Sequence, residues 1–471
     1  MYSQIQHLVS QVGRLLPGMV EKLLKYQFLK LTFAAIVGYC SFTYKAYEDF
    51  RGHDHPFISD VMNYHSYLPA FFVHDDLSFS FPNEYWTTKA PNGNKIAKGT
   101  MGMAFMYTPF FLVGHTWASM SDYPTDGYSF PYYVMVRAGT LLYCLLGLAL
   151  TAATLLRFYR ERDVAITIAA LFLGTNLFYY TLGWGEMPHA YLFFLFSAVI
   201  FYTVRWHETD KGKYLLCIAF IGGLCVLIRP TAILILFVPV MYGLHAGASV
   251  KVHLQRIYSY KWHLAIGFLL FLLPIFPQLL YWKTYAGSWL FFSYGNGERF
   301  FFDNPHIVDF LFSYRKGWFI YTPLMFLGVV GFIFMSKSAK KFQLIILFLI
   351  PLLIYVFSSW WSWWYGGGFG QRSMIQYYSV MAIPLGAFIS YFMKKWITAI
   401  PLVLICSFFV LLNLKQSRQY KNNLLHWESM TKDSYWYIFM KDSFSTAEEW
   451  QILDSMLKHP DPEAAKRGED T

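Results

Sequence analysis

The 471 residues are 56% hydrophobic and only 14% charged, a composition that excludes a soluble domain of this length and indicates a membrane protein. The net charge of +10 does not predict nucleic-acid binding, because the basic residues lie mainly at the ends of apolar runs, where membrane topology explains them. All five cysteines lie within apolar runs, which predicts neither a structural disulfide nor a cysteine-bound metal.

Residues 1–27 place Ile and Leu at roughly helical spacing, which predicts an amphipathic segment on the cytoplasmic face of the membrane. No cleavable signal precedes the first strong apolar run, so this run is expected to remain as an anchor. Eleven runs have the pattern of helices that cross a hydrocarbon core of roughly 30 Å. They cover residues 28–44, 130–156, 164–181, 188–206, 214–228, 231–247, 262–282, 318–335, 342–359, 373–392 and 396–413. The sequence therefore predicts an all-α polytopic membrane protein with a transmembrane domain over residues 28–413.

Basic clusters occur at alternate ends of these runs. With the lysines near the N-terminus assigned to the cytoplasm, strict alternation puts every later basic cluster on the same side. A full span at 101–119 would reverse this order, so that run is predicted to be interfacial or re-entrant. Three substantial segments then lie outside: 45–129, 283–317 and the tail 414–471. A site that faces away from the cytoplasm has to be built from them.

Asp60 is the acid of most interest in the first external loop. Its neighbours in the sequence are apolar: Phe57, Ile58, Val61 and Met62. Partial desolvation would raise the basicity of the carboxylate and suit it to take a proton from a hydroxyl or an amine. A helix cap or a loop salt bridge is the structural alternative for the same aspartate.

The same loop is rich in histidine. On paper, a metal site could be assembled from His53, His55, His65, His74 and Asp76. Their spacing matches no tight ligand motif, so no metal is predicted.

The segment 360–372 reads WWSWWYGGGFGQR and lies at the outer end of a predicted span. Its tryptophans, Trp364 among them, could form an aromatic belt at the membrane interface or contact a bound ligand. Its glycines, which include Gly370, would be costly in a plain anchor but permit close approach of the backbone to a ligand. Arg372 and Arg229 lie near the external interface, where an unpaired cation is costly and usually functional. Their guanidinium groups can form paired hydrogen bonds to the oxygens of a lipid phosphate.

One predicted anchor span precedes a large external loop with predicted interfacial helices, and this loop carries an early aspartate, then Asn63-Tyr64 and the motif LPA at 68–70. Further along are the stretches KGTMG at 98–102, EMPH at 186–189 and RPT at 229–231, together with Arg137. This arrangement resembles the GT-C superfamily of glycosyltransferases, in particular the protein O-mannosyltransferases and the bacterial aminoarabinose transferases.

This resemblance implies that Asp60 is the catalytic base and that Tyr64, Lys98 and His189 contribute to the substrate pocket. A frequent family version has Asp-Glu at the first position, whereas Val61 follows Asp60 here. A second acid would then have to be Asp75 or Asp76.

We therefore expect an inverting transferase that moves a sugar from a polyprenyl-phosphate donor to a lipid, protein or glycan acceptor. It would work at the external or periplasmic face of the inner (plasma) membrane, without a cofactor, a metal or nucleic acid. One carboxylate and two arginines suffice, because polyprenyl phosphate is a weak base and leaves without a general acid. A transporter or flippase for a lipid-linked sugar is an alternative, although the chain lacks the internal repeats of many transporters. A lipid-linked polysaccharide polymerase or ligase is the third possibility.

Overall fold

The computed structural model describes residues 26–47, 57–81, 87–245, 249–293, 297–335 and 339–469. Helix makes up 69% of the structure. The described residues contain a single small sheet, the antiparallel hairpin of β1 (Thr87–Lys89) and β2 (Lys95–Ala97). The predicted helical class is confirmed, while residues 1–25 of the predicted cytoplasmic segment lie outside the described residues.

Six helices among the described residues are long and apolar enough to cross a membrane, which makes the chain a membrane-embedded protein. They are α6 (Phe130–Leu155), α9 (Pro188–Thr209), α13 (Lys261–Ala286), η3 with α17 (Ala339–Phe342 and Gln343–Ser358), η4 with α18 (Arg372–Tyr377 and Tyr378–Phe392) and α19 (Trp396–Lys421).

The other five predicted spans correspond to helices that are shorter or less apolar. They are α2 (Gln27–Tyr47), α7 (Glu161–Leu173) with α8 (Tyr179–Leu182), α10 (Lys213–Ile228), η1 (Pro230–Leu236) with α11 (Phe237–Met241), and α16 (Leu324–Gly331) with η2 (Phe332–Phe334). A surface helix, α12 (Val250–Ser259), joins α11 to α13 and buries none of its residues. The count of eleven spans remains a prediction.

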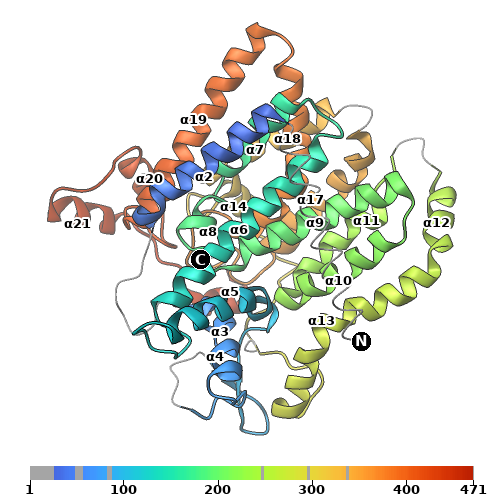
Figure 1. Cartoon of the computed structure of the whole chain (residues 1–471). Helices are drawn as coiled ribbons and strands as arrows, with labels where there is room; N and C mark the ends of the chain where they lie inside the picture. Colours follow the sequence, from blue (N-terminus) through green and yellow to red (C-terminus); the bar gives the residue numbers. More distant parts are fainter. Residues whose placement is uncertain are drawn as a thin grey trace.

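The helices form a bundle with a buried interior and apolar outer helices. The most apolar stretches of α9 and of the η4–α18 segment are 78% buried within the protein, but those of α13 and α19 are only 22% buried. In Figure 1, α9 lies within the bundle, and α13 and α19 lie at its margins. Exposed apolar surface of this extent fits contact with lipid. Glycines permit close packing: a Cβ at Gly223 of α10 would collide with the backbone of Phe271 in α13.

Two prolines set helix boundaries beside polar side chains. Pro230 disfavours helical geometry at Arg229, which is extended with φ −148° and ψ 123°, and α10 therefore ends at Ile228. Met187 is likewise extended before Pro188, and α9 starts at this proline. Each interruption leaves a polar side chain at a helix end, beside other chain segments.

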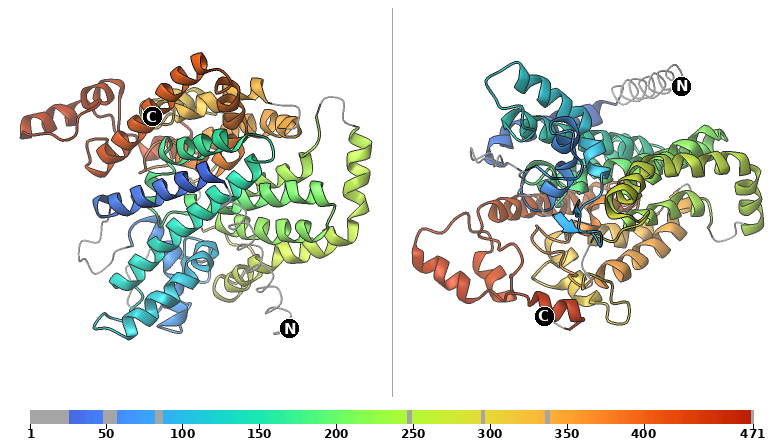
Figure 2. Two further views of the ribbon diagram at one scale, coloured as in Figure 1. Left: turned by 45° about the horizontal axis from the view of Figure 1, so that its top comes forward. Right: turned by 90° about the horizontal axis from the view of Figure 1, so that it is seen from below.

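The first predicted external loop contains α3 (Asp60–His65), α4 (Tyr67–Phe72), the hairpin and α5 (Gly102–Ser119). Helix α5 packs against α6 and has the bounds expected for the 101–119 run. The side-chain amides of Asn92 and Asn94 each donate a hydrogen bond of 2.9 Å to the carbonyl oxygen of Tyr285, at the end of α13. The hairpin, drawn as blue arrows in the right view of Figure 2, is thereby joined to the segment that precedes α14 (Ile307–Phe312) and α15 (Trp318–Tyr321).

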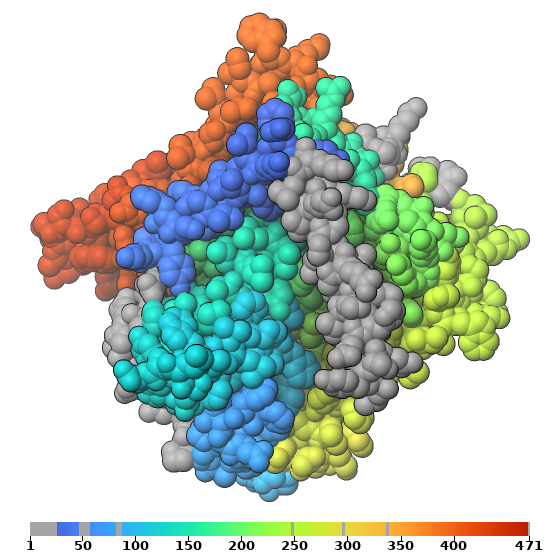
Figure 3. Space-filling view, in the orientation of Figure 1, coloured from blue at the N-terminus to red at the C-terminus, as the bar shows by residue number. Residues whose placement is uncertain are grey.

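The carboxyl-terminal tail contains α20 (Lys432–Ile438), α21 (Ala447–Ser455) and α22 (Pro462–Arg467). Helix α19 runs to Lys421, past the predicted end of the last span at residue 413, because polar residues continue the helix beyond its apolar part. Gln416 in this extension donates to the Tyr435 hydroxyl at 2.8 Å, and Gln419 donates to the Ile438 carbonyl at 2.7 Å. These bonds attach α20 to the end of α19, and the tail projects from the left of the molecule in Figure 3.

Candidate active site

Asp60 and Arg372 meet at the centre of the candidate site. Nη2 of Arg372 lies 3.6 Å from Oδ2 of Asp60, and the two side chains are 11% and 38% exposed, respectively. Asp60 is the first residue of α3, and Arg372 is the first residue of η4. Among the described residues, Nε and Nη1 of Arg372 are buried without a hydrogen-bond partner. Buried donors without partners are costly. The site is therefore suited to an additional anion beside this guanidinium.

Arg229 and Tyr64 complete this cluster. The extended backbone before Pro230 ends α10 at Ile228 and places Arg229 just beyond the helix. Burial raises the pKa of the Tyr64 hydroxyl and the Asp60 carboxylate raises it further, while the guanidinium groups of Arg229 and Arg372 lower it. Two cations and one carboxylate thus surround a buried phenol that can donate or accept a hydrogen bond.

Tyr180 and His189 lie beside the two arginines. The Tyr180 hydroxyl accepts a hydrogen bond of 3.0 Å from the Phe369 backbone amide and interacts electrostatically with both arginines and with Asp60. The His189 ring, 4.7 Å from the Tyr180 ring, also interacts electrostatically with Arg229 and Arg372. His189 is fully buried in the second position of α9. It forms part of the inner wall of the cluster.

The segment 360–372, called the glycine-rich loop from here on, passes close to the cluster at Gly368. A Cβ at this position would lie 2.6 Å from the Tyr180 hydroxyl and 3.2 Å from Cδ of Arg372. Lys316, which is buried, donates hydrogen bonds to the carbonyl oxygens of Gly368 and Trp427, the latter at 2.5 Å. Burial lowers the pKa of Lys316 well below its ordinary value, and the nearby Arg372 lowers it further. Lys316 therefore holds the loop and the tail together behind the arginine.

A buried ion pair lies at the turn that precedes α9 and His189. Nη1 of Arg137 lies 3.1 Å from Oε1 of Glu186, with side-chain exposures of 2% and 6%. The same Arg137 nitrogen donates to the Tyr133 hydroxyl at 3.0 Å, and Nη2 donates to the carbonyl oxygen of Leu182. These partners of its two terminal nitrogens identify Arg137 as a structural residue that holds the turn before α9.

Three predicted site residues lie elsewhere. Lys98 forms an ion pair of 3.0 Å with Glu298, which links the first and second loop segments. Gly370 has φ 60°, and a Cβ there would lie 2.9 Å from Cβ of Tyr321. Its small size serves the turn and the packing of the loop on α15.

Trp364 faces the tail. Its indole nitrogen donates a hydrogen bond of 3.4 Å to Oε2 of Glu428, and the guanidinium carbon of Arg315 lies 5.2 Å from the centre of its ring. Burial raises the pKa of Glu428, and the bond from Trp364 opposes this shift. This tryptophan belongs to the junction between the loop and the tail.

The histidines of the first loop have other contacts. A ring nitrogen of His65 lies 2.7 Å from the carbonyl oxygen of Gly127, and its ring stacks on Phe57 at 3.8 Å. His74 stacks on Phe81 at 3.9 Å. Within the described part of the chain, no group of three or more His, Cys, Asp or Glu side chains could hold a metal ion. His53 and His55 lie outside the described residues.

The two candidates for a second acid differ from Asp60. The Asp76 carboxylate accepts backbone hydrogen bonds from Ser78 at 2.8 Å and from Ser80 at 2.9 Å, together with bonds from both serine hydroxyls. These bonds lower the pKa of Asp76 well below its ordinary range. Asp75 has φ 50°, a turn conformation. Asp76 is therefore engaged in its own turn.

Sequence reasoning missed Tyr180 and Lys316. Tyr180 lies at the end of an apolar run, where an aromatic residue is typical of a membrane interface. Lys316 lies in a polar loop, where a lysine is expected to be solvated. Its neighbour Arg315 and the Gly-Trp sequence that follows offer no signal of burial.

The arrangement can bind an anion and accept a proton in the same space. Arg229 and Arg372 supply positive charge, and their guanidinium groups suit phosphate oxygens. The partly exposed Asp60 carboxylate can act as a general base. No family model matches the chain, and no curated protein matches it in sequence.

Proposed function

We propose that the protein is an inverting glycosyltransferase that moves a sugar from a polyprenyl-phosphate donor to an acceptor at the external face of the membrane. The observation that carries the proposal is the approach of Arg372 to Asp60 at 3.6 Å, with Arg229 and Tyr64 beside them. A base and a leaving-group site in one cluster are what this reaction requires. The resemblance to the GT-C superfamily, with Asp60 as the base, agrees with this reading.

In the proposed reaction, Asp60 takes the proton from the acceptor hydroxyl or amine. The acceptor atom forms a bond to the anomeric carbon from one side, while the bond from that carbon to the phosphate oxygen breaks on the other. The electron pair of that bond leaves with the phosphate, and the guanidinium groups of Arg229 and Arg372 stabilise its growing negative charge. A single displacement inverts the anomeric configuration.

Burial of Arg372 increases its effect on a phosphate. An ion pair formed away from water is screened less than one at the surface, so the same guanidinium stabilises more charge. A donor with a prenyl chain also fits the surroundings, because the chain would lie along apolar helices in the bilayer. The full set of eleven spans, with the N-terminus in the cytoplasm, would place the cluster at the external side, as the basic clusters predict.

The alternative function is transport of a lipid-linked sugar, in which the arginines would line a pathway. Proteoliposomes that contain the full-length protein and donors labelled separately in the sugar and in the prenyl chain distinguish the two. A panel of hexose, pentose and aminopentose donors, with the membrane lipids and proteins of the host as acceptors, covers the open identities. We expect the sugar label to move to a new molecule and the prenyl label to remain as polyprenyl phosphate. If both labels stay in one molecule that crosses the bilayer, the protein is a transporter.

A further inference from the structure

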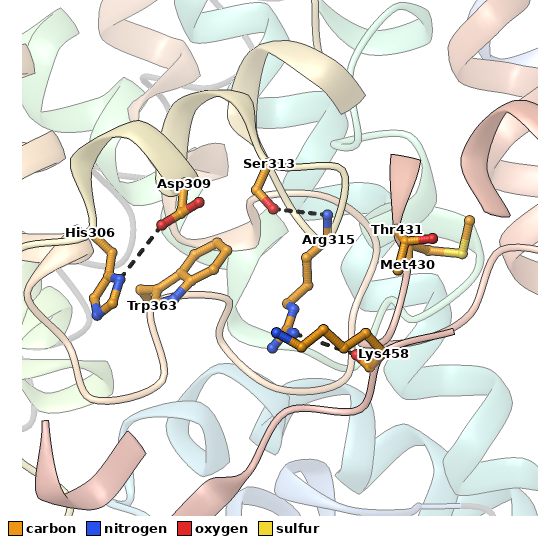
Figure 4. A pocket seen from close by; sticks show the side chains of 8 residues that line it. All are labelled: His306, Asp309, Ser313, Arg315, Trp363, Met430, Thr431 and Lys458. Carbon is orange, nitrogen blue, oxygen red and sulfur yellow. Dashed lines mark hydrogen bonds and ion pairs between the residues drawn. The ribbon is translucent and has the colours of Figure 1, made fainter. Parts of the chain in front are cut away.

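A cavity lies between the 306–315 segment, the glycine-rich loop and the tail. It has a volume of about 350 Å³, within the range of sites for small molecules. Figure 4 shows the side chains that surround it, which include His306, Asp309, Arg315, Trp363, Thr431 and Lys458. They come from three segments that are far apart in the sequence. The cavity therefore depends on the docking of the tail.

Arg315 is the central cation of this cavity. Arg315 is 6% exposed, and within the described part of the chain its Nη1 is buried without a hydrogen-bond partner. Nη2 makes only a long contact of 3.4 Å with the carbonyl oxygen of Lys458. The side chain of Arg315 remains charged at all physiological pH values. A buried guanidinium with an unpaired donor favours an acceptor group on a bound molecule.

The charges near Arg315 leave its preference for an anion in place. Glu428 and Asp309 are the acids that interact with it electrostatically. Glu428 also accepts a bond from Trp364, and Asp309 forms a pair of 3.6 Å with His306. Of these two acids only Asp309 lines the cavity, whereas Arg315 and Lys458 both do. The cationic side chains therefore exceed the free acidic ones.

The remaining side chains are those that bind sugars. Trp363 presents an aromatic surface for the apolar face of a pyranose ring. The Asp309 carboxylate can accept hydrogen bonds from sugar hydroxyls. A flat aromatic ring, a carboxylate and two cations in one cavity match a sugar that carries a carboxylate or a phosphate.

This cavity shares a wall with the candidate active site. Arg315 is followed by Lys316, whose amino group bonds to Gly368, and Gly368 lies against Arg372. On the other side, the Gln371 side chain donates a hydrogen bond of 3.1 Å to the carbonyl oxygen of Trp363. One loop thus borders both the proposed donor site and this cavity.

We propose that the cavity binds an anionic sugar unit of the acceptor. The role of this sugar as an acceptor rests on the proposed transferase function, but its binding to the cavity does not. An acceptor held here would extend from the tail side of the loop toward Asp60 on the other side. The anion could be a uronic acid carboxylate or a sugar phosphate, which have the same requirement for Arg315 and Lys458.

The test is saturation-transfer NMR on the full-length protein in nanodiscs, with four probes: methyl glucuronide, glucose 6-phosphate, methyl glucoside and inorganic phosphate. Methyl glucuronide and glucose 6-phosphate, the two charged sugars, should bind, as detected through their ring protons. Methyl glucoside should bind at least about five-fold more weakly. Inorganic phosphate, used as a competitor, should displace them only at a higher concentration. A difference between the two charged sugars identifies the source of the charge.

The variant Lys458→Gln should weaken binding of the preferred charged sugar about ten-fold, the loss expected for one charge-assisted hydrogen bond of about 1.4 kcal/mol. Lys458 is exposed, so the variant should fold. Lys395→Gln is the matched control, because Lys395 is also exposed. It caps the amino-terminal end of α19, whereas the tail follows the carboxyl-terminal end of this helix. Trp363→Phe provides a second variant, which should weaken all sugars but not phosphate.

Equal binding of methyl glucoside and the charged sugars, competition by phosphate as strong as by the sugar phosphate, or no effect of Lys458→Gln would each overturn the inference. The outcome is separable from that of the proposed function, because this measurement needs no donor. Sugar binding without any transfer would support the sugar site in this cavity and contradict the transferase function. Transfer without sugar binding at this cavity would support the transferase function and contradict the sugar site.

Discussion

Arg137 and Arg372 are both buried arginines beside an acidic side chain, yet their surroundings differ. Arg137 lies 3.1 Å from Glu186 and bonds to a tyrosine hydroxyl and a backbone carbonyl. Arg372 lies 3.6 Å from a partly exposed Asp60, and two of its nitrogens have no hydrogen-bond partner in the described part of the chain. The first arrangement pairs the cation with several groups of the protein, whereas the second leaves buried donors with which an external anion could pair.

This difference separates structure from function at two positions that look alike in the sequence. A buried ion pair with further hydrogen bonds costs stability when one member is removed, because the other remains as an unpaired charge. An incompletely partnered cation costs less to remove, because its charge was not balanced in the first place. Mutation of Arg137 should therefore affect folding, and mutation of the Asp60–Arg372 cluster should affect activity.

The largest effect is expected for Asp60→Asn. Loss of the base should lower sugar transfer by roughly 10²- to 10⁴-fold, the usual contribution of general base catalysis. The measurement is single-turnover transfer with bound donor, and the folding control is the thermal midpoint in detergent. Asp75→Asn is the matched control, and we expect it to retain transfer. Equal losses in both variants would mean that Asp60 has no special role.

The next effect concerns stability. Arg137→Leu leaves Glu186 buried without its partner and should lower the free energy of unfolding by about 3–5 kcal/mol. Thermal unfolding in detergent measures this loss. The double variant Arg137→Leu/Glu186→Leu should recover much of it, since no charge is then left unpaired. No loss in the single variant would remove the distinction between the two arginines.

A pH dependence of about the same size follows from His65. Burial lowers the pKa of His65 to about 4 in the folded protein, from about 6.5 in the unfolded chain. Above pH 6.5 the ring is neutral in both states. As the pH falls from 6.5 to 4, only the unfolded chain gains the proton, so the folded protein loses about 3 kcal/mol.

Thermal midpoints between pH 7 and pH 4 measure this loss. The decline should be smaller in His65→Gln, which cannot titrate, and unchanged in the control His245→Gln, where the histidine is exposed. An identical pH profile in wild type and His65→Gln would contradict the assignment of a buried neutral ring.

The smallest effect is expected for Lys98→Gln. Its pair with Glu298 is partly exposed, with side-chain exposures of 29% and 20%, and such pairs contribute about 0–1 kcal/mol. Transfer should change by less than about five-fold. A loss as large as that of Asp60→Asn would place Lys98 at the donor and extend the cluster to the first loop segment.

The sequence was sufficient to predict the helical membrane class and much of the cluster. Apolar runs report directly on burial in lipid, and Asp60, Arg229 and Arg372 stand out because charges near such runs are costly. Six of the predicted spans meet the length and hydropathy of membrane helices in the structure. The roles assigned to these residues remain predictions, although the structure brings five of the eight predicted site residues together: Asp60, Tyr64, His189, Arg229 and Arg372.

The rest depends on contacts between distant segments. Trp364 and Gly370 belong to the right loop but point to the tail and to α15, which no local pattern reveals. Lys316 is buried only because the glycine-rich loop and the tail supply two carbonyl oxygens. The end of α19 was missed because its last turns are polar and are covered by α20.

The central claim is that the cluster at Arg372 holds the phosphate of a lipid-linked donor. The most direct measurement is the dissociation constant of polyprenyl phosphate, by native mass spectrometry or by titration in nanodiscs, for wild type, Arg372→Gln and Lys98→Gln. We predict that Arg372→Gln raises the constant about 10- to 100-fold, as for loss of hydrogen bonds to a charged group, while its thermal midpoint does not fall and Lys98→Gln binds like wild type. Equal binding by wild type and Arg372→Gln, with both proteins folded, would contradict the account.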